Sequence, residues 1–264
     1  MNEIQNIVLI GAGNLATHLG LAIQKTGRKI VQVFSRTEES ALHLAGILNA
    51  DFTCDPQDIS READLYILSV TDDAANQISG TLNLGQKLVV HTSGSLPMNI
   101  LRKSSENFGV LYPLQTFSKS RSVDFDTVPL CIEASSADNL QLLEHFAKEL
   151  SHKVVEVDSE KRKIIHVAAV FACNFPNFMY NIADKILADK GLNFDLLRPL
   201  ILETAVKVQE LKPEEAQTGP SIRGDKTILR KHDELLKEYP EYREIYKKLS
   251  EAIRNSRNKW EIYE

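Results

Sequence analysis

Residues 6–16 read NIVLIGAGNLA, an apolar run that ends in Gly-Ala-Gly and leads directly into a helical pattern. This is the Gly-x-Gly-x-x-Ala form of the dinucleotide fingerprint, at the turn from a first strand to a first helix. In such a turn Gly11 makes the tight bend, Gly13 lets the backbone approach a pyrophosphate, and Ala16 lets the helix pack closely against the strand. The start of the helix holds phosphates through its free N–H groups. We therefore predict a cofactor-binding turn that also includes Asn14 and Leu15; the alternative is a tight turn without a ligand.

The segment after the second strand, expected over residues 30–34, favours one dinucleotide over the other. An NAD-binding fingerprint carries Asp or Glu about 20 residues past the glycines, where it accepts a hydrogen bond from the ribose 2′-hydroxyl. Here that position is Ser35, followed by Arg36 and Thr37. A hydroxyl and a guanidinium would bind a 2′-phosphate that a carboxylate would repel. We predict NADP(H); the alternative is a solvated Arg36, or one that stacks on adenine in an NAD site.

Two further apolar runs, 64–70 and 87–90, predict buried parallel strands whose carboxyl ends lie at the ligand-binding edge of the sheet. Val70 ends the first run and is expected to border the cofactor. Asp72 or Asp73 is expected to cap the helix that follows.

The second run leads into His91-Thr92-Ser93-Gly94-Ser95, a polar loop that would face the nicotinamide. We take His91 and Ser93 as catalytic candidates that orient the nicotinamide amide or the substrate, and Ser95 as a substrate contact. The alternative is that Ser95 caps a helix and the hydrogen bonds only shape the turn.

The strand-like alternation stops at Asp158, and the rest of the chain has helical patterns. The predicted fold is α/β, with a Rossmann-type, doubly wound, mostly parallel sheet followed by a smaller all-helical domain. The predicted domains are an NADP-binding domain at 1–158 and a helical substrate and dimerisation domain at 159–264.

The first helix of that second half is apolar nearly all round, so it should be buried on most sides, and Pro176 should kink or split it. His166 and Asn174 are polar exceptions that helical spacing places on one stripe. Buried polar groups need partners, and histidine can donate a proton near neutral pH, so both are catalytic candidates. The alternative is a core histidine with its hydrogen bonds satisfied and an asparagine bonded to backbone near the proline.

A turn-rich stretch at 218–225 reads TGPSIRGD. Arg223 could hold a substrate carboxylate or phosphate with two hydrogen bonds. The alternative is an ion pair with Asp225 that only shapes the turn.

The composition limits the possible partners. The chain has 264 residues, 43% hydrophobic and 25% charged, with a net charge of −5, which suits a globular protein and gives no sign of nucleic-acid binding. No apolar run has membrane-spanning length, and a strand that begins within a few residues leaves no room for a signal peptide. Cys54, Cys131 and Cys173 are widely spaced, so we expect reduced thiols in the cytoplasm and no metal site.

Together the fingerprint, the Ser-Arg-Thr segment, the 91–95 loop, the helix with His166 and Asn174, and the 218–225 turn resemble a bacterial family described as NADP oxidoreductases. In that family a Rossmann-like domain precedes a helical domain of unknown function, and the resemblance covers essentially the whole chain. The two-domain plan is more distantly similar to pyrroline-5-carboxylate reductase, deazaflavin-dependent NADP reductases and β-hydroxyacid dehydrogenases. The chain lacks the lysine-plus-asparagine helix pattern of the last group. The resemblance implies NADP use and a homodimer built through the helical domain, and it implies no particular substrate.

These observations favour an oxidoreductase that moves a hydride between NADPH and a small carbonyl or imine compound. The alternative is a sensor or regulatory protein that binds NADP without turnover.

Overall fold

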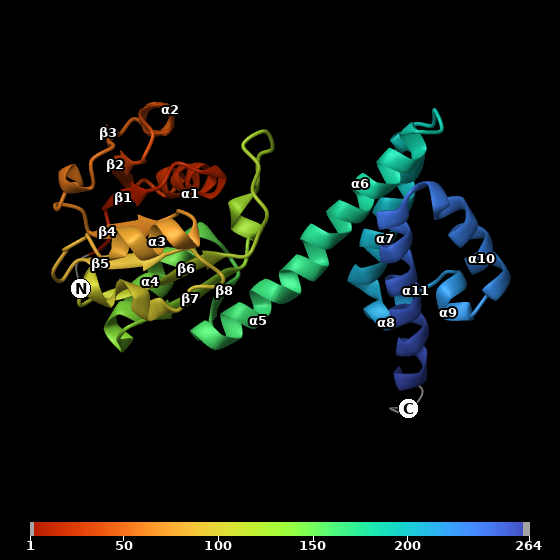
Figure 1. The fold of residues 1–264 in the computed structure, drawn as a ribbon. Helices are drawn as coiled ribbons and strands as arrows, with labels where there is room; N and C mark the ends of the chain where they lie inside the picture. The colour runs from red at the N-terminus through yellow and green to blue at the C-terminus, as the bar shows by residue number, and fades with distance from the viewer. Residues whose placement is uncertain (1–2, 261–264) are drawn as a thin grey trace. The chain divides into compact units, whose positions relative to one another are not determined.

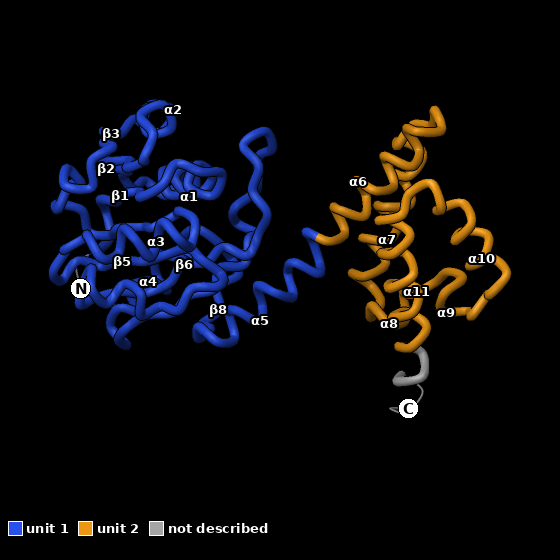
Figure 2. The backbone as a smooth tube through the Cα atoms, viewed as in Figure 1, with its two compact units in different colours: residues 1–174 blue, residues 175–264 orange. Residues whose placement is uncertain are grey.

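The computed structural model describes residues 3–260, which form two compact units that divide between Asn174 and Phe175 (Figure 2). The last strand ends at Glu156, and the regular elements after it are helices. The division between the units falls 18 residues after Glu156, inside a helical stretch. The predicted domain boundary after Asp158 stays a prediction.

The first unit is built on one eight-stranded sheet (Figure 1). Its strands are β1 Asn6–Ile10, β2 Lys29–Phe34, β3 Asp51–Thr53, β4 Leu65–Leu68, β5 Leu88–His91, β6 Phe108–Pro113, β7 Leu130–Ala134 and β8 Val154–Glu156. They lie in the order β3-β2-β1-β4-β5-β6-β7-β8, and every neighbouring pair is parallel except β6 with β7. The predicted Rossmann-type, mostly parallel sheet is confirmed.

Both faces of the sheet are buried. Ile7 and Leu9 of β1 pack into a core with helices α1 Asn14–Lys25, α2 Glu38–Leu48 and α4 Ala137–Leu150. Val8 and Ile10 point the other way, into a core bordered by α3 Asp72–Ser79 and the 3-10 helix η2 Met98–Lys103. Because a parallel sheet covered on both sides hides every strand residue, its strands read as continuous apolar runs.

The strand order reverses direction between β1 and β4, since the chain first adds β2 and β3 on one side and then β4 and β5 on the other. Doubly wound sheets bind ligands at this switch point, outside the carboxyl ends of the strands. The order of the strands alone therefore places the candidate site beyond Ile10 and Leu68.

The first unit ends in α5 Ser159–Ala169 and a π-helical turn over Val170–Asn174. The helix α6 Phe175–Ala188 follows at once. The predicted break lies here, because Pro176 has no N–H to donate to the preceding turn. The expectation that this helix is buried on most sides is wrong for the single chain, since Ile164, Val167 and Phe171 are 57–70% exposed.

The second unit is helical throughout the described residues. Beside α6 it contains the 3-10 helix η5 Phe194–Leu197, α7 Arg198–Glu210, α8 Pro213–Ala216, α9 Pro220–Arg223, α10 Lys226–Leu235, the 3-10 helix η6 Leu236–Glu238 and α11 Pro240–Trp260. Within residues 3–260, no helix combines the length and apolarity that a bilayer span requires.

Candidate functional site

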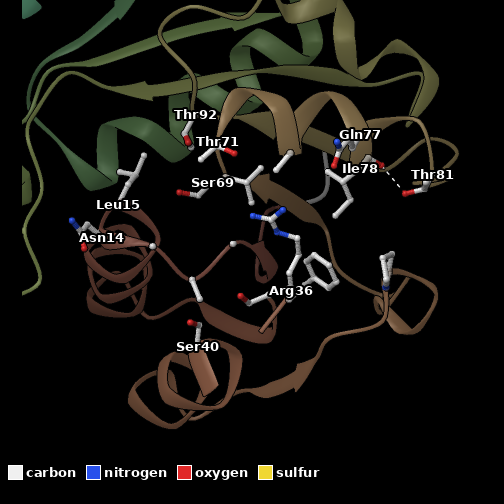
Figure 3. Close-up of a pocket in the computed structure, with 18 residues that line it drawn as sticks. Asn14, Leu15, Arg36, Ser40, Ser69, Thr71, Gln77, Ile78, Thr81 and Thr92 are labelled. Carbon is white, nitrogen blue, oxygen red and sulfur yellow. Dashed lines mark hydrogen bonds between the residues drawn. The ribbon is translucent and has the colours of Figure 1, made fainter. Parts of the chain in front are cut away.

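A cavity of about 660 Å³ opens at the carboxyl ends of β1, β2 and β4 (Figure 3). Its wall brings together segments that are far apart in the sequence: the glycine turn, the end of β2, the first turn of α2, the β4–α3 segment and the start of the loop after β5. Seven of the predicted cofactor residues line it: Gly11, Gly13, Asn14, Leu15, Ser35, Arg36 and Val70.

The two glycines of the turn differ in backbone conformation and in the space around them. Gly11 has φ of +122°, and a Cβ placed there would lie 2.1 Å from the carbonyl oxygen of Ser69. Gly13 has an ordinary φ of −80°, and a Cβ there would meet no atom within 4 Å. Gly11 is thus needed by the fold itself, whereas Gly13 leaves space free at the mouth of the cavity.

The start of α1 is suited to an anion. No side chain caps it, and its first turn contains no acidic residue. The N–H groups at Asn14 and Leu15 lie on the cavity wall with the partial positive charge of the helix end. An anionic group in the cavity would satisfy them.

The end of β2 forms the other side of the cavity. Arg36 reaches across the opening, and Ser40 faces it from the first turn of α2 (Figure 3). Thr37 is the N-cap residue of α2 and is not among the residues that line the cavity. Ser40 was missed by the sequence analysis, although a serine one helical turn from the strand end could have signalled it. Among the described residues that line the cavity there is no Asp or Glu.

Thr92 continues the cavity wall into the loop after β5. In that loop the hydroxyl of Ser93 donates to Asp72 Oδ1 at 2.8 Å and accepts from the N–H groups of Ser95 and Leu96, each at 3.1 Å. Ser95 Oγ also donates to Asp72. Both serines are thereby engaged in shaping the loop.

Asp72 corrects an expectation about the start of α3. The N-cap residue of that helix is Thr71, so neither Asp72 nor Asp73 occupies the cap position. Asp72 holds the serine loop instead, a contact with residues 21 and 23 positions away that no local pattern indicates.

The predicted catalytic candidate His91 lies at the end of β5 with its side chain completely buried. Its Nδ1 accepts the N–H of Ser93 at 3.2 Å. Burial, with the charge of Arg162 nearby, lowers the pKa of His91 to about 4, so the ring is neutral at pH 7. The ring supports the loop in this structure, and a catalytic role of His91 stays a prediction.

His166 lies close to the same loop, on α5. Its Nδ1 is 2.9 Å from the hydroxyl of Tyr112, which lies near the end of β6. The two rings meet edge to face, with centroids 6.0 Å apart. A Cβ at Gly94 would lie 2.6 Å from the same Nδ1, so the loop passes directly against the histidine. Tyr112 was missed, although a tyrosine at the carboxyl end of a central strand is a usable signal.

Arg162 anchors α5 beneath this pair. Its side chain is fully buried and forms an ion pair with Glu133 of β7 at 2.5 Å. It also donates to the carbonyl oxygen of Leu96, so one guanidinium connects the helix, the sheet and the serine loop. No local sequence pattern indicates these contacts, since Glu133 and Leu96 are 29 and 66 residues away from Arg162.

The two remaining candidates are exposed. Asn174 lies at the end of the π-helical turn. Arg223 lies in the second unit at the end of α9, and Asp225 caps α10 by accepting the N–H of Ile228 at 3.1 Å. Within residues 3–260, no ion pair joins Arg223 to Asp225. Their predicted roles in a site stay predictions.

Comparison with protein families matches the two halves separately. Residues 6–94 match a family described as NADP oxidoreductase coenzyme F420-dependent, and residues 128–253 match a domain of unknown function, DUF2520. A comparison with curated proteins gave no match.

Among solved structures, the chain is similar to the "putative NADP oxidoreductase BF3122 from Bacteroides fragilis", with 47% sequence identity, a TM-score of 0.91, and coverage of 96% of this chain and 98% of that one. An imine reductase from Myxococcus stipitatus in complex with NADP⁺ shares the fold at 17% identity and a TM-score of 0.63, covering 96% and 93% of the two chains. A 1-pyrroline-5-carboxylate reductase from Streptococcus pyogenes shares it at 13% identity and a TM-score of 0.61, covering 95% and 98%. The chain therefore belongs to the same family as the Bacteroides fragilis protein, in which a Rossmann domain of the NADP oxidoreductase type precedes a DUF2520 helical domain.

Proposed function

We propose that the protein is an NADP-dependent oxidoreductase that transfers a hydride between NADPH and a small carbonyl or imine compound. The observation that carries the proposal is the end of β2, where Ser35, Arg36 and Ser40 surround a cavity wall that has no carboxylate among the described residues. A guanidinium and two hydroxyls match a 2′-phosphate, whereas the NAD-binding fingerprint carries a carboxylate at this place. The open start of α1 would then hold the pyrophosphate.

Equilibrium binding of NADPH and NADH tests the cofactor. NADPH should bind at least tenfold more tightly, and Arg36→Ala should weaken NADPH by about 10- to 100-fold, the equivalent of a charge-assisted hydrogen bond worth about 1.5–3 kcal/mol. Binding of NADH should change by less than about threefold, since it lacks the 2′-phosphate. Arg102→Ala, which removes another exposed arginine of the same unit, is the matched control. Equal affinity for the two cofactors in the unaltered protein would refute the proposal.

The serine loop and His166 are the residues proposed to serve the reaction itself. NADPH supplies a hydride from C4 of its nicotinamide when it is bound. Thr92 lines the cavity, and Gly94 two residues later lies directly against the His166 ring. The histidine is therefore the residue proposed to donate a hydrogen bond to the oxygen or nitrogen of the substrate. NADPH consumption over a panel of carbonyl and imine compounds tests this step. Tight NADPH binding without turnover of any compound would favour the sensor instead.

The proposal includes a homodimer formed through the helical unit and a location in the cytoplasm. The helical unit exposes many large apolar side chains, which favours a second copy as its partner. Cys54, Cys131 and Cys173 are all free thiols, as a reducing compartment would keep them. Arg223 and Asn174 remain proposed contacts of the substrate or of its surroundings.

A further inference from the structure

In the hydrogen bond between Tyr112 and His166, the surroundings determine which group donates and which accepts. Tyr112 is 8% exposed, and His166 Nδ1 is the hydrogen-bond partner of its hydroxyl within residues 3–260. If Nδ1 carried the proton and donated, the phenolic hydrogen would be left without a partner in a mostly buried place. If the phenol donates, one hydrogen bond satisfies both groups, and buried donors are normally satisfied.

The ionisation of Tyr112 supports the same direction. Burial raises the pKa of Tyr112, the neighbouring Cys131 adds to the effect, and Arg162 opposes it. The hydroxyl thus keeps its proton at neutral pH and is available as a donor.

The proton of a neutral imidazole is on one of its two nitrogens, and the hydrogen bond made by one nitrogen selects the other for the proton. We propose that Tyr112 is a positioning residue that holds His166 in the Nε2-protonated form, so that the histidine offers a hydrogen-bond donor to the reacting group of the substrate. The loop reinforces the arrangement, since Gly94 lets the backbone pass where a side chain would displace the ring.

The tautomer also restricts the class of substrate, and this step of the inference rests on the proposed function. An Nε2–H donor pairs with an atom that has a free lone pair, such as a carbonyl oxygen or the nitrogen of a neutral imine. A protonated iminium has no lone pair on nitrogen and would meet donor against donor. The preferred acceptor of the hydride is therefore an uncharged carbonyl or imine compound. The histidine stabilises the negative charge that develops on its heteroatom through the Nε2–H hydrogen bond, and that heteroatom then takes its proton from solvent water.

Long-range ¹H–¹⁵N correlation spectra of the full chain, labelled at histidine and recorded near pH 8.5, measure the tautomer directly. In the unaltered protein we expect a protonated Nε2 and an unprotonated Nδ1 for His166, with the signals assigned through His166→Gln. Tyr112→Phe should release the constraint, and both tautomers should then be populated. Gly94→Ala should have the same effect by pushing the pair apart, because its Cβ would lie 2.6 Å from His166 Nδ1 and 2.9 Å from Tyr112 Cζ.

The chain contains its own control in a second pair of the same geometry. His232 Nδ1 lies 2.8 Å from the hydroxyl of Tyr246, with the rings edge to face and 5.7 Å apart. Tyr246→Phe should change the spectrum of His232 and leave that of His166 alone. A protonated Nδ1 on His166 in the unaltered protein, or a tautomer unchanged by Tyr112→Phe, would overturn the inference.

Kinetics separate this inference from the proposed function. With a substrate in hand, Tyr112→Phe should lower kcat at least tenfold while KM and the Kd for NADPH stay within about twofold. If no compound is turned over but the spectra show the expected tautomer, the proposed function fails and the role of Tyr112 in holding the ring stands.

Discussion

His91 shows how one buried side chain makes stability depend on pH. The ring lies at the end of β5 with no exposed surface, and its Nε2 has no hydrogen-bond partner in the described part of the chain. In the folded protein its pKa is lowered to about 4, from an ordinary value of 6.5 that the unfolded chain would recover. Between these values the unfolded chain binds one more proton than the folded one, so the stabilisation is complete above pH 6.5 and is lost as the pH falls toward 4.

This difference predicts a loss of about 2 kcal/mol in the free energy of unfolding between pH 7.5 and pH 5 from His91 alone, at about 1.36 kcal/mol per pH unit below 6.5. Urea unfolding at a series of pH values measures it. His91→Asn keeps an acceptor for the Ser93 N–H, and although it lowers stability at every pH, it should remove this part of the pH dependence. His152→Asn, at an exposed histidine, should leave the dependence as it is. A pH profile that His91→Asn leaves unchanged would contradict the assignment.

At the scale of the element, the two glycines of the turn from β1 to α1 are expected to differ in their roles. Gly11 is needed for the stability of the fold, and Gly13 is proposed to be needed for binding NADPH. Gly11→Ala puts a Cβ against the Ser69 carbonyl at a φ that only glycine adopts easily, and we expect it to cost about 3 kcal/mol or more. Gly13→Ala meets open space at an ordinary φ, so its melting temperature should stay within a few degrees of the unaltered protein. Its methyl group would occupy the room left for the pyrophosphate, and NADPH affinity should fall at least tenfold.

Thermal unfolding and NADPH titration on the same two variants check this prediction. Ala12→Gly serves as a control at the position between them, because it adds no atom to the cavity. Tight NADPH binding by Gly13→Ala would show that the cofactor does not approach this turn.

The elements that the sequence predicts correctly are those that a local sequence pattern indicates. The apolar run into Gly11 and Gly13 identifies the first strand, the turn and the helix, and the segment after β2 that lacks a carboxylate supplies Ser35 and Arg36 to the cavity wall. The contacts that were missed join distant positions: Tyr112 and His166 are 54 residues apart, and Arg162 and Glu133 are 29 apart. Only the folded sheet brings such residues together, so no local spacing could have paired them.

The burial of the helix after Asp158 could not be predicted from the sequence either, because burial also depends on contacts with distant residues. The apolar character of the helix after Asp158 predicts a surface that packs against a partner, and that partner stays a prediction. In the single chain Ile164 is 70% exposed and Val167 is 57% exposed.

At the scale of the whole molecule, the helical unit has too little core for its apolar content. Among its described residues only Ile182 and Ser221 are buried, and its exposed apolar side chains include Leu196, Leu200 and Leu202 at 62–66%. Monomeric soluble proteins rarely leave large apolar surfaces in water, and obligate dimers bury such surfaces between subunits. A second copy of the chain is the partner that the predicted homodimer supplies.

We therefore predict a dimer in sedimentation equilibrium at micromolar concentration and below. The double change Leu196→Glu/Leu200→Glu should give monomers, because burying each leucine stabilises the dimer by about 1.5–3 kcal/mol and a carboxylate in its place would have to be desolvated without a partner. Leu42→Glu, at an apolar residue on α2 of the first unit that is 54% exposed, should leave the dimer intact.

A monomeric unaltered protein would show that these leucines face solvent or another partner, whereas a dimer that survives the double change would place the interface elsewhere. Since NADPH affinity depends on the first unit alone in this proposal, the monomeric variant should bind NADPH within about threefold of the unaltered protein, which separates the loss of the interface from general unfolding.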